Sequence, residues 1–336
     1  MNYEEFAEEI RWGVENMVRD RFGDGVAVIR SVTKNNNVRM KAISIMRKEE
    51  KATPTIYIRD YYDHYKKGRT IENICEEIFH IYKCGIEKFK YNFDPNDFMQ
   101  LEKIKGRVFY KLINYEMNKK MLKDMPYFKY LDLAIVFYIM ISCDESGQAS
   151  AMVHNIHLDS WKISPEELKE IALKNTWNTY PAVIKPMEDI VSEMIMGEIM
   201  EDDDSEDYEG GDVIREDFQY GEFDYDEVKN IIREEIEKLK ADSEMKMYVL
   251  TNQIRTNGAA CITYPGVLRE FAEEHDSDVY IIPSSIHEVI LIEGTEWEKS
   301  KLNQMVMEVN AKELDPVEVL ADHIYVFKRE DNEIHY

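Results

Sequence analysis

The chain has 336 residues, of which 44% are hydrophobic and 11% aromatic, so most of it is expected to fold, and its length favours two domains. Its formal net charge of −25 opposes direct nucleic-acid binding, which needs a stripe of basic residues interleaved with aromatic ones that is not evident here. The acidic N-terminus is unlike a signal peptide and the longest apolar run, residues 133–141, is too short to span a membrane, so a cytoplasmic location is expected.

Hydrophobic periodicity and turn residues define the elements of the first third of the chain. Apolar residues at helical spacing from Phe6 to Val18 predict an amphipathic helix, which Gly23 ends. Asparagine tolerates the positive φ angles of a hairpin turn, so the Lys-Asn-Asn-Asn stretch at 34–37 is expected to connect two strands. The other elements expected here are strands at 26–32, 38–45 and 55–58 and a helix at 70–82.

A second group of strands is expected in the middle of the chain, at 108–114, 131–141 and 149–156. The helix that follows has a well-marked start. Ser164 is an N-cap residue, Pro165 occupies the first helical position, and Glu167 completes a capping box.

Residues 201–227 differ in composition from the rest of the chain. They hold fourteen acidic residues against one basic residue, Arg215, which gives this stretch a net charge of −13. Blocks of like charge repel each other and resist compaction, so the stretch is expected to be a mobile, solvated linker. The candidate partner-binding residues in it are Asp202, Asp203, Asp204, Glu206 and Asp207.

After a helix at 228–239, the C-terminal third predicts a β-β-α-β-β core. The expected strands lie at 247–251, 258–263, 279–282 and 286–292, the helix at 266–274, and a helix at 297–309, a capped turn at 315–318 and a strand at 323–328 follow. Because the elements mix without a repeating βαβ period, the expected class is α+β, with mixed or antiparallel sheets and packed helices. We expect two lobes, residues 1–196 and 228–336, joined by an acidic linker at 197–227.

The cysteines and the common signatures of bound groups give no sign of a metal or a cofactor. The four cysteines, Cys75, Cys84, Cys143 and Cys261, are far apart and none has zinc-site or redox spacing. We therefore expect reduced, packed thiols. Nucleotide-binding and hydrolase motifs are absent from the sequence, and no cofactor is expected.

Six segments spread along the chain carry a family resemblance: TIYIRDYY (55–62), KLINYE (111–116), LDLAIVFY (131–138), MYVLTN (247–252), GAACITYPGVL (258–268) and PSSIHEVIL (283–291). Together they resemble a bacterial family that carries only the label of a domain of unknown function. The resemblance covers nearly the whole chain apart from the acidic stretch. It implies no activity and no catalytic residues, because none is established for that family.

The strongest candidates for chemistry are Ser284, Ser285, His287 and Glu288, which bring two hydroxyls, an imidazole and a carboxylate to the junction of two apolar strands. Neighbouring strand side chains diverge, so a catalytic triad built from them is geometrically poor. A structural hydrogen-bonded turn is therefore favoured over ligand binding and over catalysis. In the catalytic interpretation, Asn252 or His154 completes the site.

Two further groups of residues are candidate binding sites. His154 and His157 lie three residues apart near Asp159, but strand residues at that spacing face opposite sides, so a strand end with one buried histidine is favoured over a metal site. Four tyrosines near Asp60 are expected to be half-buried packing residues with wet hydroxyl ends rather than an aromatic groove. They are Tyr57, Tyr61, Tyr62 and Tyr65.

The favoured function is a non-catalytic binding or accessory protein whose acidic surface binds a basic protein partner, such as a nucleic-acid-handling or defence protein. Membrane association is not expected. One alternative is an enzyme of unrecognised class with its site at residues 284–288, and another is a structural subunit of a homo-oligomer. Convergence of the polar groups in one concave pocket favours the enzyme, whereas an acidic face without such a pocket favours the binding protein.

Replacing Asp202, Asp203, Asp204, Glu206 and Asp207 together by Asn or Gln is expected to slow association with a basic partner and to flatten its salt dependence. Exposed charges act over long range mainly on the association rate, and they contribute little to folding stability. Stopped-flow association rates at several salt concentrations, together with thermal unfolding, measure both effects. An association rate that ignores salt and these substitutions contradicts the prediction.

Overall fold

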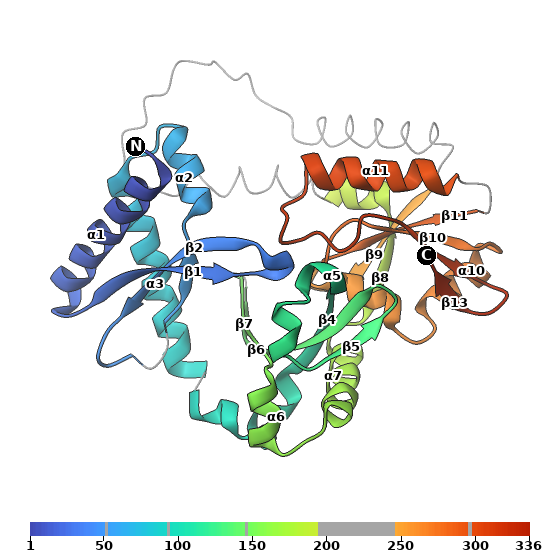
Figure 1. Ribbon diagram of the computed structural model, residues 1–336, viewed down its shortest axis with the longest axis horizontal. Coiled ribbons are helices and arrows are strands. Elements are labelled where there is room, and N and C mark those ends of the chain that lie inside the picture. Colours follow the sequence, from blue (N-terminus) through green and yellow to red (C-terminus); the bar gives the residue numbers. More distant parts are fainter. Residues whose placement is uncertain (51–52, 93–94, 145–146, 194–245, 295–297) are drawn as a thin grey trace, which may run out of the picture. The chain divides into compact units, whose positions relative to one another are not determined.

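The computed structural model describes residues 1–50, 53–92, 95–144, 147–193, 246–294 and 298–336, and these form helices and open antiparallel sheets of the α+β class (Figure 1). The chain divides into two units. The N-terminal unit comprises residues 1–181 and 310–321, and the C-terminal unit comprises residues 182–309 and 322–336. The linker expected at 197–227 lies outside the described residues, so its boundaries stay a prediction.

The first helix, α1 (Tyr3–Phe22), has the start and end that the sequence predicts. Asn2 Oδ1 accepts the Glu5 N–H, and Glu5 Oε2 accepts the Asn2 N–H, both at 3.0 Å, which completes a capping box. Gly23 ends the helix with a φ of 80°, which glycine adopts without the steric cost of a Cβ atom. The fully buried side chains of the predicted apolar stripe are Phe6, Ile10, Val14 and Val18.

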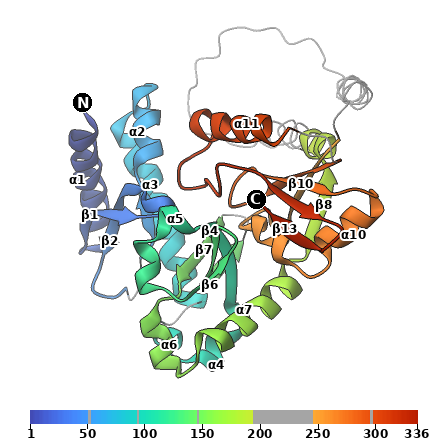
Figure 2. The same ribbon diagram turned by 45° about the vertical axis from the view of Figure 1, so that its right-hand side comes forward.

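A three-stranded sheet follows, in the order β1-β2-β3. Its strands are β1 (Val26–Thr33), β2 (Arg39–Met46) and β3 (Thr55–Tyr57), and the next helices are α2 (Arg59–Lys66) and α3 (Ile71–Asn92). In both views α1, α2 and α3 lie together beside β1 and β2 (Figures 1 and 2). The predicted hairpin turn is confirmed, since Asn36 and Asn37 adopt φ angles of 58° and 59°.

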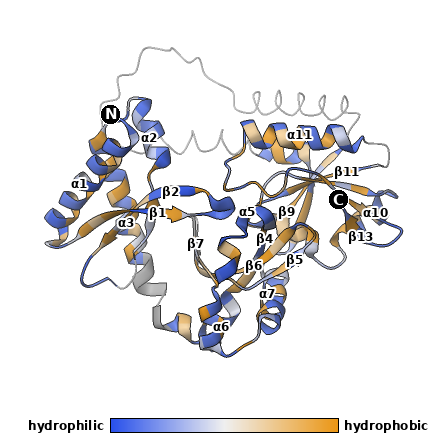
Figure 3. Cartoon of the chain, viewed as in Figure 1, coloured by the Kyte–Doolittle hydropathy of each residue, from blue (hydrophilic) through white to orange (hydrophobic). Residues whose placement is uncertain are grey.

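The hairpin turn at 34–37 is hydrophilic, as Figure 3 shows, yet it contributes to a buried polar network. Asn118, at the end of α5 (Tyr115–Asn118), is 0% exposed. Its Oδ1 accepts the Asn36 N–H at 2.8 Å, and its Nδ2 donates to Asn36 Oδ1 at 2.9 Å and to Asn114 O at 2.8 Å. The amide of Asn118 therefore joins the hairpin to α5.

The same network binds a segment from near the C-terminus. Asn36 Nδ2 donates to Pro316 O at 2.8 Å and to Val319 O at 2.7 Å. Asn35 Nδ2 donates to Val317 O at 2.7 Å, and Asn114 Nδ2 donates to Leu320 O at 3.0 Å. The capped turn predicted at 315–318 is confirmed by the Val317 N–H bond to Asp315 Oδ1 at 3.0 Å. Asparagine amides thus hold residues 316–320 in the N-terminal unit.

A second sheet of the N-terminal unit is centred on β6 (Leu133–Asp144), which pairs with all three other strands. These are β4 (Val108–Asn114), β5 (Tyr127–Tyr130) and β7 (Gly147–Met152). The helix α7 (Pro165–Thr179) begins with the predicted capping box and packs on β4, where Tyr110 N–H donates to Thr176 Oγ1 at 3.2 Å. The strand expected at 149–156 ends earlier, and a short helix, α6 (Asn155–Trp161), begins instead.

The C-terminal unit is built on a six-stranded sheet. In sheet order the strands are β13 (Glu333–His335), β12 (Tyr325–Lys328), β10 (Val279–Pro283), β11 (Val289–Glu293), β9 (Met247–Asn252) and β8 (Ala182–Pro186). Met247 contacts the apolar cluster that includes Leu302 and Val306 of α11 (Lys299–Lys312), whereas Tyr248 contacts Phe271 of α10 (Val267–Glu274). Because neighbouring strand residues point to opposite faces, α11 and α10 cover opposite faces of this sheet.

The strand predicted at 258–263 is wrong, because Gly258–Thr263 forms a 3₁₀ helix. Asn257 precedes it with a φ of 56°, which turns the chain away from an extended path. Gly258 then lies so close to the backbone of β9 and of the next hairpin that a Cβ atom on it would be 2.5 Å from His287 O and 2.8 Å from Asn252 N. The β-β-α-β-β core therefore has a 3₁₀ helix in place of its second strand.

The described cysteines have free thiols. Burial raises the pKa of Cys75 to about 11 and that of Cys261 to about 12, so both thiols stay protonated near neutral pH. Cys84 is only partly buried, with Sγ 3.5 Å from His80 Nε2, and departs from the expectation of full packing. The side chain of Cys143 lies outside the described residues. Among the described helices, none is long and apolar enough to cross a membrane.

Asn118→Ala is expected to lower the free energy of unfolding by about 3 kcal/mol or more, because it leaves the buried Asn36 N–H and several carbonyl oxygens without partners. Chemical denaturation measures the change. The control is Asn155→Ala, which removes one exposed bond, at 3.3 Å to Lys123 O, and is expected to cost less than about 0.5 kcal/mol. Equal effects of the two substitutions contradict this role for Asn118.

Candidate functional site

The predicted polar site, residues 284–288, forms the hairpin turn between β10 and β11. The Ser285 N–H donates to Glu288 O at 3.1 Å, which closes the turn. Ser284 Oγ donates to Glu288 Oε1 at 3.3 Å, and Ser285 Oγ accepts the His287 N–H at 2.9 Å. The structure therefore brings all four predicted residues together, and these hydrogen bonds are those of a structural turn.

This turn is tied to the segment that follows β9. His287 Nδ1 accepts the Asn257 N–H at 3.2 Å, and His287 O accepts the hydroxyl of Thr251 at 2.8 Å. A ring nitrogen that accepts a backbone proton is not available to take a proton from a serine hydroxyl. The contacts of His287 thus favour the structural interpretation of the turn over a Ser-His pair.

The two residues that were expected to complete an enzyme site have other surroundings. Asn252 is buried, its Nδ2 donates to Thr256 O at 2.9 Å, and its Oδ1 accepts the Thr256 N–H at 3.3 Å, so it stabilises its own loop. His154 belongs to the N-terminal unit, whereas the turn at 284–288 belongs to the C-terminal unit.

The strand-end interpretation of the two histidines is wrong, because His154 is the N-cap residue of α6 and His157 lies in its first turn. The His154 N–H donates to His157 Nδ1 at 2.9 Å. Burial lowers the pKa of His157, and the charge of His154 acts in the same direction. The ring of His157 stacks on Trp161 with centroids 5.5 Å apart, so this imidazole caps and packs α6.

The remaining predicted residues fall into two groups. The acidic candidates Asp202, Asp203, Asp204, Glu206 and Asp207 lie outside the described residues. Tyr61, Tyr62 and Tyr65 are partly buried and pack against the core cluster of the N-terminal unit, while Tyr57 lies under Lys34 Nζ at 4.1 Å. Tyr62 also lines a cavity, which the tyrosine pattern alone does not indicate.

An acidic groove of about 510 Å³ lies in the C-terminal unit between β8 and α10. Its floor is formed by Ala182, Ile184 and Pro186, alternate residues that share one face of β8. The acidic groove is further lined by Tyr248, Val267, Glu270, Phe271, Glu274 and His275. The lining of the acidic groove thus combines apolar and aromatic side chains with two carboxylates.

Negative charge concentrates around the tyrosine of this groove. Burial raises the pKa of Tyr248, and the charges of Glu293, Glu188 and Glu274 act in the same direction. His275 Nδ1 lies 2.6 Å from Glu293 Oε2, and the His275 ring lies 4.3 Å from that of Phe271 between centroids. The acidic groove therefore offers an electrostatic environment that favours a cationic group.

Two other features of the chain, a buried lysine and a cluster of exposed acidic and histidine side chains, lie outside the acidic groove. Burial lowers the pKa of Lys111 to about 8, with the charge of Lys34 acting in the same direction, but Lys111 lines neither the acidic groove nor the cavity of the N-terminal unit. Asp331, Glu333 and His335 offer ligand atoms within 4.8 Å of one another, and all three residues are exposed. Such clusters are common on surfaces without an ion, so neither feature enlarges the candidate site.

A comparison with models of protein families finds one that matches residues 3–329, described as a family of unknown function, DUF5688. The chain belongs to this family. The match agrees with the resemblance seen in the six segments of the sequence. Comparisons with curated proteins and with solved structures found no match. The family therefore supplies no activity to carry over to the acidic groove.

Sequence reasoning missed the acidic groove because its residues come from three separate segments. The strand β8 was not predicted, and Tyr248 precedes α10 by almost twenty positions in the printed sequence. The one local signal is the spacing of Glu270 and Glu274, which places two carboxylates one turn apart on the same side of a helix. Because β8 was not predicted, the spacing of the two glutamates alone could not indicate a groove.

Gly258→Ala is expected to lower the free energy of unfolding by about 1–3 kcal/mol, because the new Cβ meets backbone atoms that cannot move away easily. The matched control is Gly106→Ala, where the Cβ meets nothing within 4 Å, and a change of less than about 0.5 kcal/mol is expected. Thermal and chemical unfolding measure both. A neutral Gly258→Ala variant contradicts the close approach of the turn at 284–288 to the segment after β9.

Proposed function

We propose that this protein is a non-catalytic binding or accessory protein that engages a basic protein partner, and that the acidic groove receives a lysine or arginine side chain of that partner. The observation that carries the proposal is the combination, in one groove, of an apolar floor with Glu270 and Glu274 at its wall. A long cationic side chain matches both parts. Its hydrocarbon stem packs on the floor while its charged end meets the carboxylates.

The aromatic rings of the acidic groove support the same ligand class. Phe271 and Tyr248 pack with ring centroids 5.1 Å apart and an interplanar angle of 75°. A cation held over an aromatic face is attracted by the ring quadrupole, and the cation found there is more often arginine than lysine. The carboxylates and the rings therefore act on the same charged group.

The charge of the whole chain supports an electrostatically guided encounter. A formal net charge of −25 attracts basic surfaces and repels nucleic acids over distances up to about one Debye length. The acidic stretch at 201–227 contributes to this attraction in the proposal. The acidic groove then supplies preorganised short-range contacts.

The binding function is favoured over an enzyme because the polar turn at 284–288 uses its groups in hydrogen bonds within the turn and to the backbone. The lining residues of the acidic groove include no serine, threonine or cysteine that could act as a nucleophile. A basic side chain is the group that its composition fits best.

The test is titration calorimetry of the full chain with an arginine-rich octapeptide at low and moderate salt. The double variant Glu270→Gln/Glu274→Gln is expected to weaken binding about fivefold, because two partly exposed ion pairs are lost. The control Glu273→Gln/Glu308→Gln removes the same charge from exposed positions of α10 and α11 outside the acidic groove, and is expected to change affinity less than twofold.

Three results contradict the proposal. The first is a peptide affinity that does not fall with salt. The second is an equal loss of affinity in the groove variant and the control variant, which assigns the effect to net charge alone. The third is a partner whose affinity is unchanged by the acidic substitutions but is lost with His287→Ala in a protein that remains folded. That result places the functional site at the turn at 284–288.

A further inference from the structure

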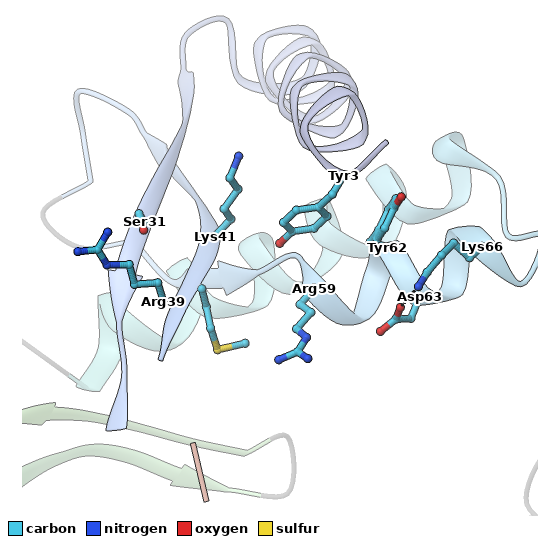
Figure 4. A pocket seen from close by; sticks show the side chains of 9 residues that line it. Tyr3, Ser31, Arg39, Lys41, Arg59, Tyr62, Asp63 and Lys66 are labelled. Atoms are coloured by element: carbon cyan, nitrogen blue, oxygen red, sulfur yellow. Dashed lines mark ion pairs between the residues drawn. The ribbon is translucent and has the colours of Figure 1, made fainter. Parts of the chain in front are cut away.

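A cavity of opposite charge lies in the N-terminal unit. It has a volume of about 520 Å³ and is bounded by β1, β2, the start of α1 and α2. We call it the cationic pocket, and its lining residues are Tyr3, Ser31, Arg39, Met40, Lys41, Arg59, Tyr62, Asp63 and Lys66. In Figure 4 Arg59 lies beside Tyr3 of α1 and near Tyr62 of α2, whereas Arg39 and Ser31 lie at the other end of the lining, on the sheet.

The charge of the cationic pocket is unusual for so acidic a chain. Four lining residues are cations and one is an acid, which leaves a formal charge of +3 on the lining. Lys41 pairs with Glu4, and Lys66 Nζ lies 2.6 Å from Asp63 Oδ1. Two cations thus have carboxylate partners within their own unit.

The two arginines of the cationic pocket are different. Within the described part of the chain, neither Arg39 nor Arg59 forms an ion pair, although acidic residues outnumber basic ones 67 to 42 in the whole sequence. Arg59 nevertheless acts on its surroundings. Burial raises the pKa of Tyr3, and the positive charge of Arg59 opposes that rise, so the guanidinium acts on the tyrosine hydroxyl. The hydrogen bond from Lys66 lowers the pKa of Asp63, and the charge of Arg59 acts in the same direction. A guanidinium that forms no ion pair keeps its planar set of donors available to an external anion.

Aromatic rings form the other part of the lining. Tyr3 and Tyr62 lie with ring centroids 5.1 Å apart, and both are visible beside Arg59 in Figure 4. Tyr62 is held in place by Phe6, at 5.2 Å between centroids, and by its hydroxyl bond to Met1 O at 3.3 Å. Lys66 Nζ stands 5.1 Å from the Tyr62 ring. The pocket therefore presents fixed aromatic surface next to cations.

We propose that the cationic pocket binds a nucleoside phosphate, with the phosphate groups on Arg39 and Arg59 and the planar base against Tyr3 and Tyr62. Arginine suits phosphate because two parallel N–H donors match two phosphate oxygens. Tyrosine suits a base because every base has a flat π face. Ser31, the cross-strand neighbour of Lys41, adds a hydroxyl that can bind a phosphate or sugar oxygen.

A small ligand fits these observations better than a nucleic-acid strand. The volume of about 520 Å³ lies in the range of small-molecule sites, about 300–1,000 Å³. A long polyanion would meet the field of a chain with a net charge of −25, whereas a mononucleotide meets mainly the local charges of the pocket. This site is in the N-terminal unit and does not depend on the acidic groove of the C-terminal unit.

The test is titration calorimetry of the full chain with ATP, with inorganic tripolyphosphate and with a single-stranded oligonucleotide. We expect one ATP per chain, and tripolyphosphate at least about fivefold weaker because it lacks a base to stack. Arg59→Glu and Arg39→Glu are each expected to weaken ATP binding at least about tenfold. The matched control is Arg30→Glu, an exposed arginine of the same sheet that contacts Met46 Sδ at 3.5 Å and is expected to change affinity less than twofold.

Thermal unfolding of each variant separates loss of the ligand from loss of the fold, and both pocket arginines are exposed, so folded variants are expected. The proposal is overturned if ATP shows no saturable binding, or if Arg59→Glu and Arg30→Glu have equal effects. Equal affinity for ATP and tripolyphosphate overturns the assignment of the base to Tyr3 and Tyr62. An oligonucleotide that binds more tightly than ATP overturns the choice of a small ligand.

Discussion

The buried amide of Asn118 is the interaction on which the N-terminal unit depends. Around it meet three parts of the chain that lie far apart in sequence: the hairpin turn at 34–37, α5, and residues 316–320. A polar group without solvent has to find its partners within the protein, so these hydrogen bonds fix where each segment lies. Apolar side chains tolerate several arrangements of similar volume, whereas this network tolerates one. The hairpin that carries Arg39 and Ser31 into the cationic pocket is held at its turn by this network.

Net charge and local charge have separate consequences in this protein. The whole chain is strongly acidic, and the acidic groove continues that character with an apolar floor suited to a lysine or arginine. The cationic pocket has the opposite charge, because four of its lining residues are cations and one is an acid. At physiological ionic strength exposed charges act mainly within about 8 Å. A bound ligand is therefore affected mainly by the charges that line its own site and much less by the net charge of the chain. In the two proposals, one chain therefore offers sites for ligands of opposite sign, one in each unit.

Elements with local signals were predicted from the sequence, and sites assembled from distant segments were not. The capping residues of α1 and α7 and the asparagines of the hairpin determine local backbone geometry, so their elements were found at nearly the observed positions. The apolar run at 258–263 reads as a strand, but its burial comes from tertiary packing against β9 and the turn at 284–288. The short strands β8 and β13 depend on their neighbours for pairing, and the groove beside β8 could not be foreseen without it.

The division of the chain into units has a consequence for fragments of this protein. Residues 182–186 form an edge strand of the C-terminal unit but precede the stretch 194–245. Residues 310–321 follow that stretch but belong to the N-terminal unit, where their carbonyl oxygens accept hydrogen bonds from its asparagine amides. A single cut within that stretch yields two polypeptides, each of which retains a segment that belongs to the fold of the other unit. Separating them would strip β8 from its sheet and leave the amides of Asn35, Asn36 and Asn114 without acceptors. The cut halves should consequently stay noncovalently associated and recombine when mixed.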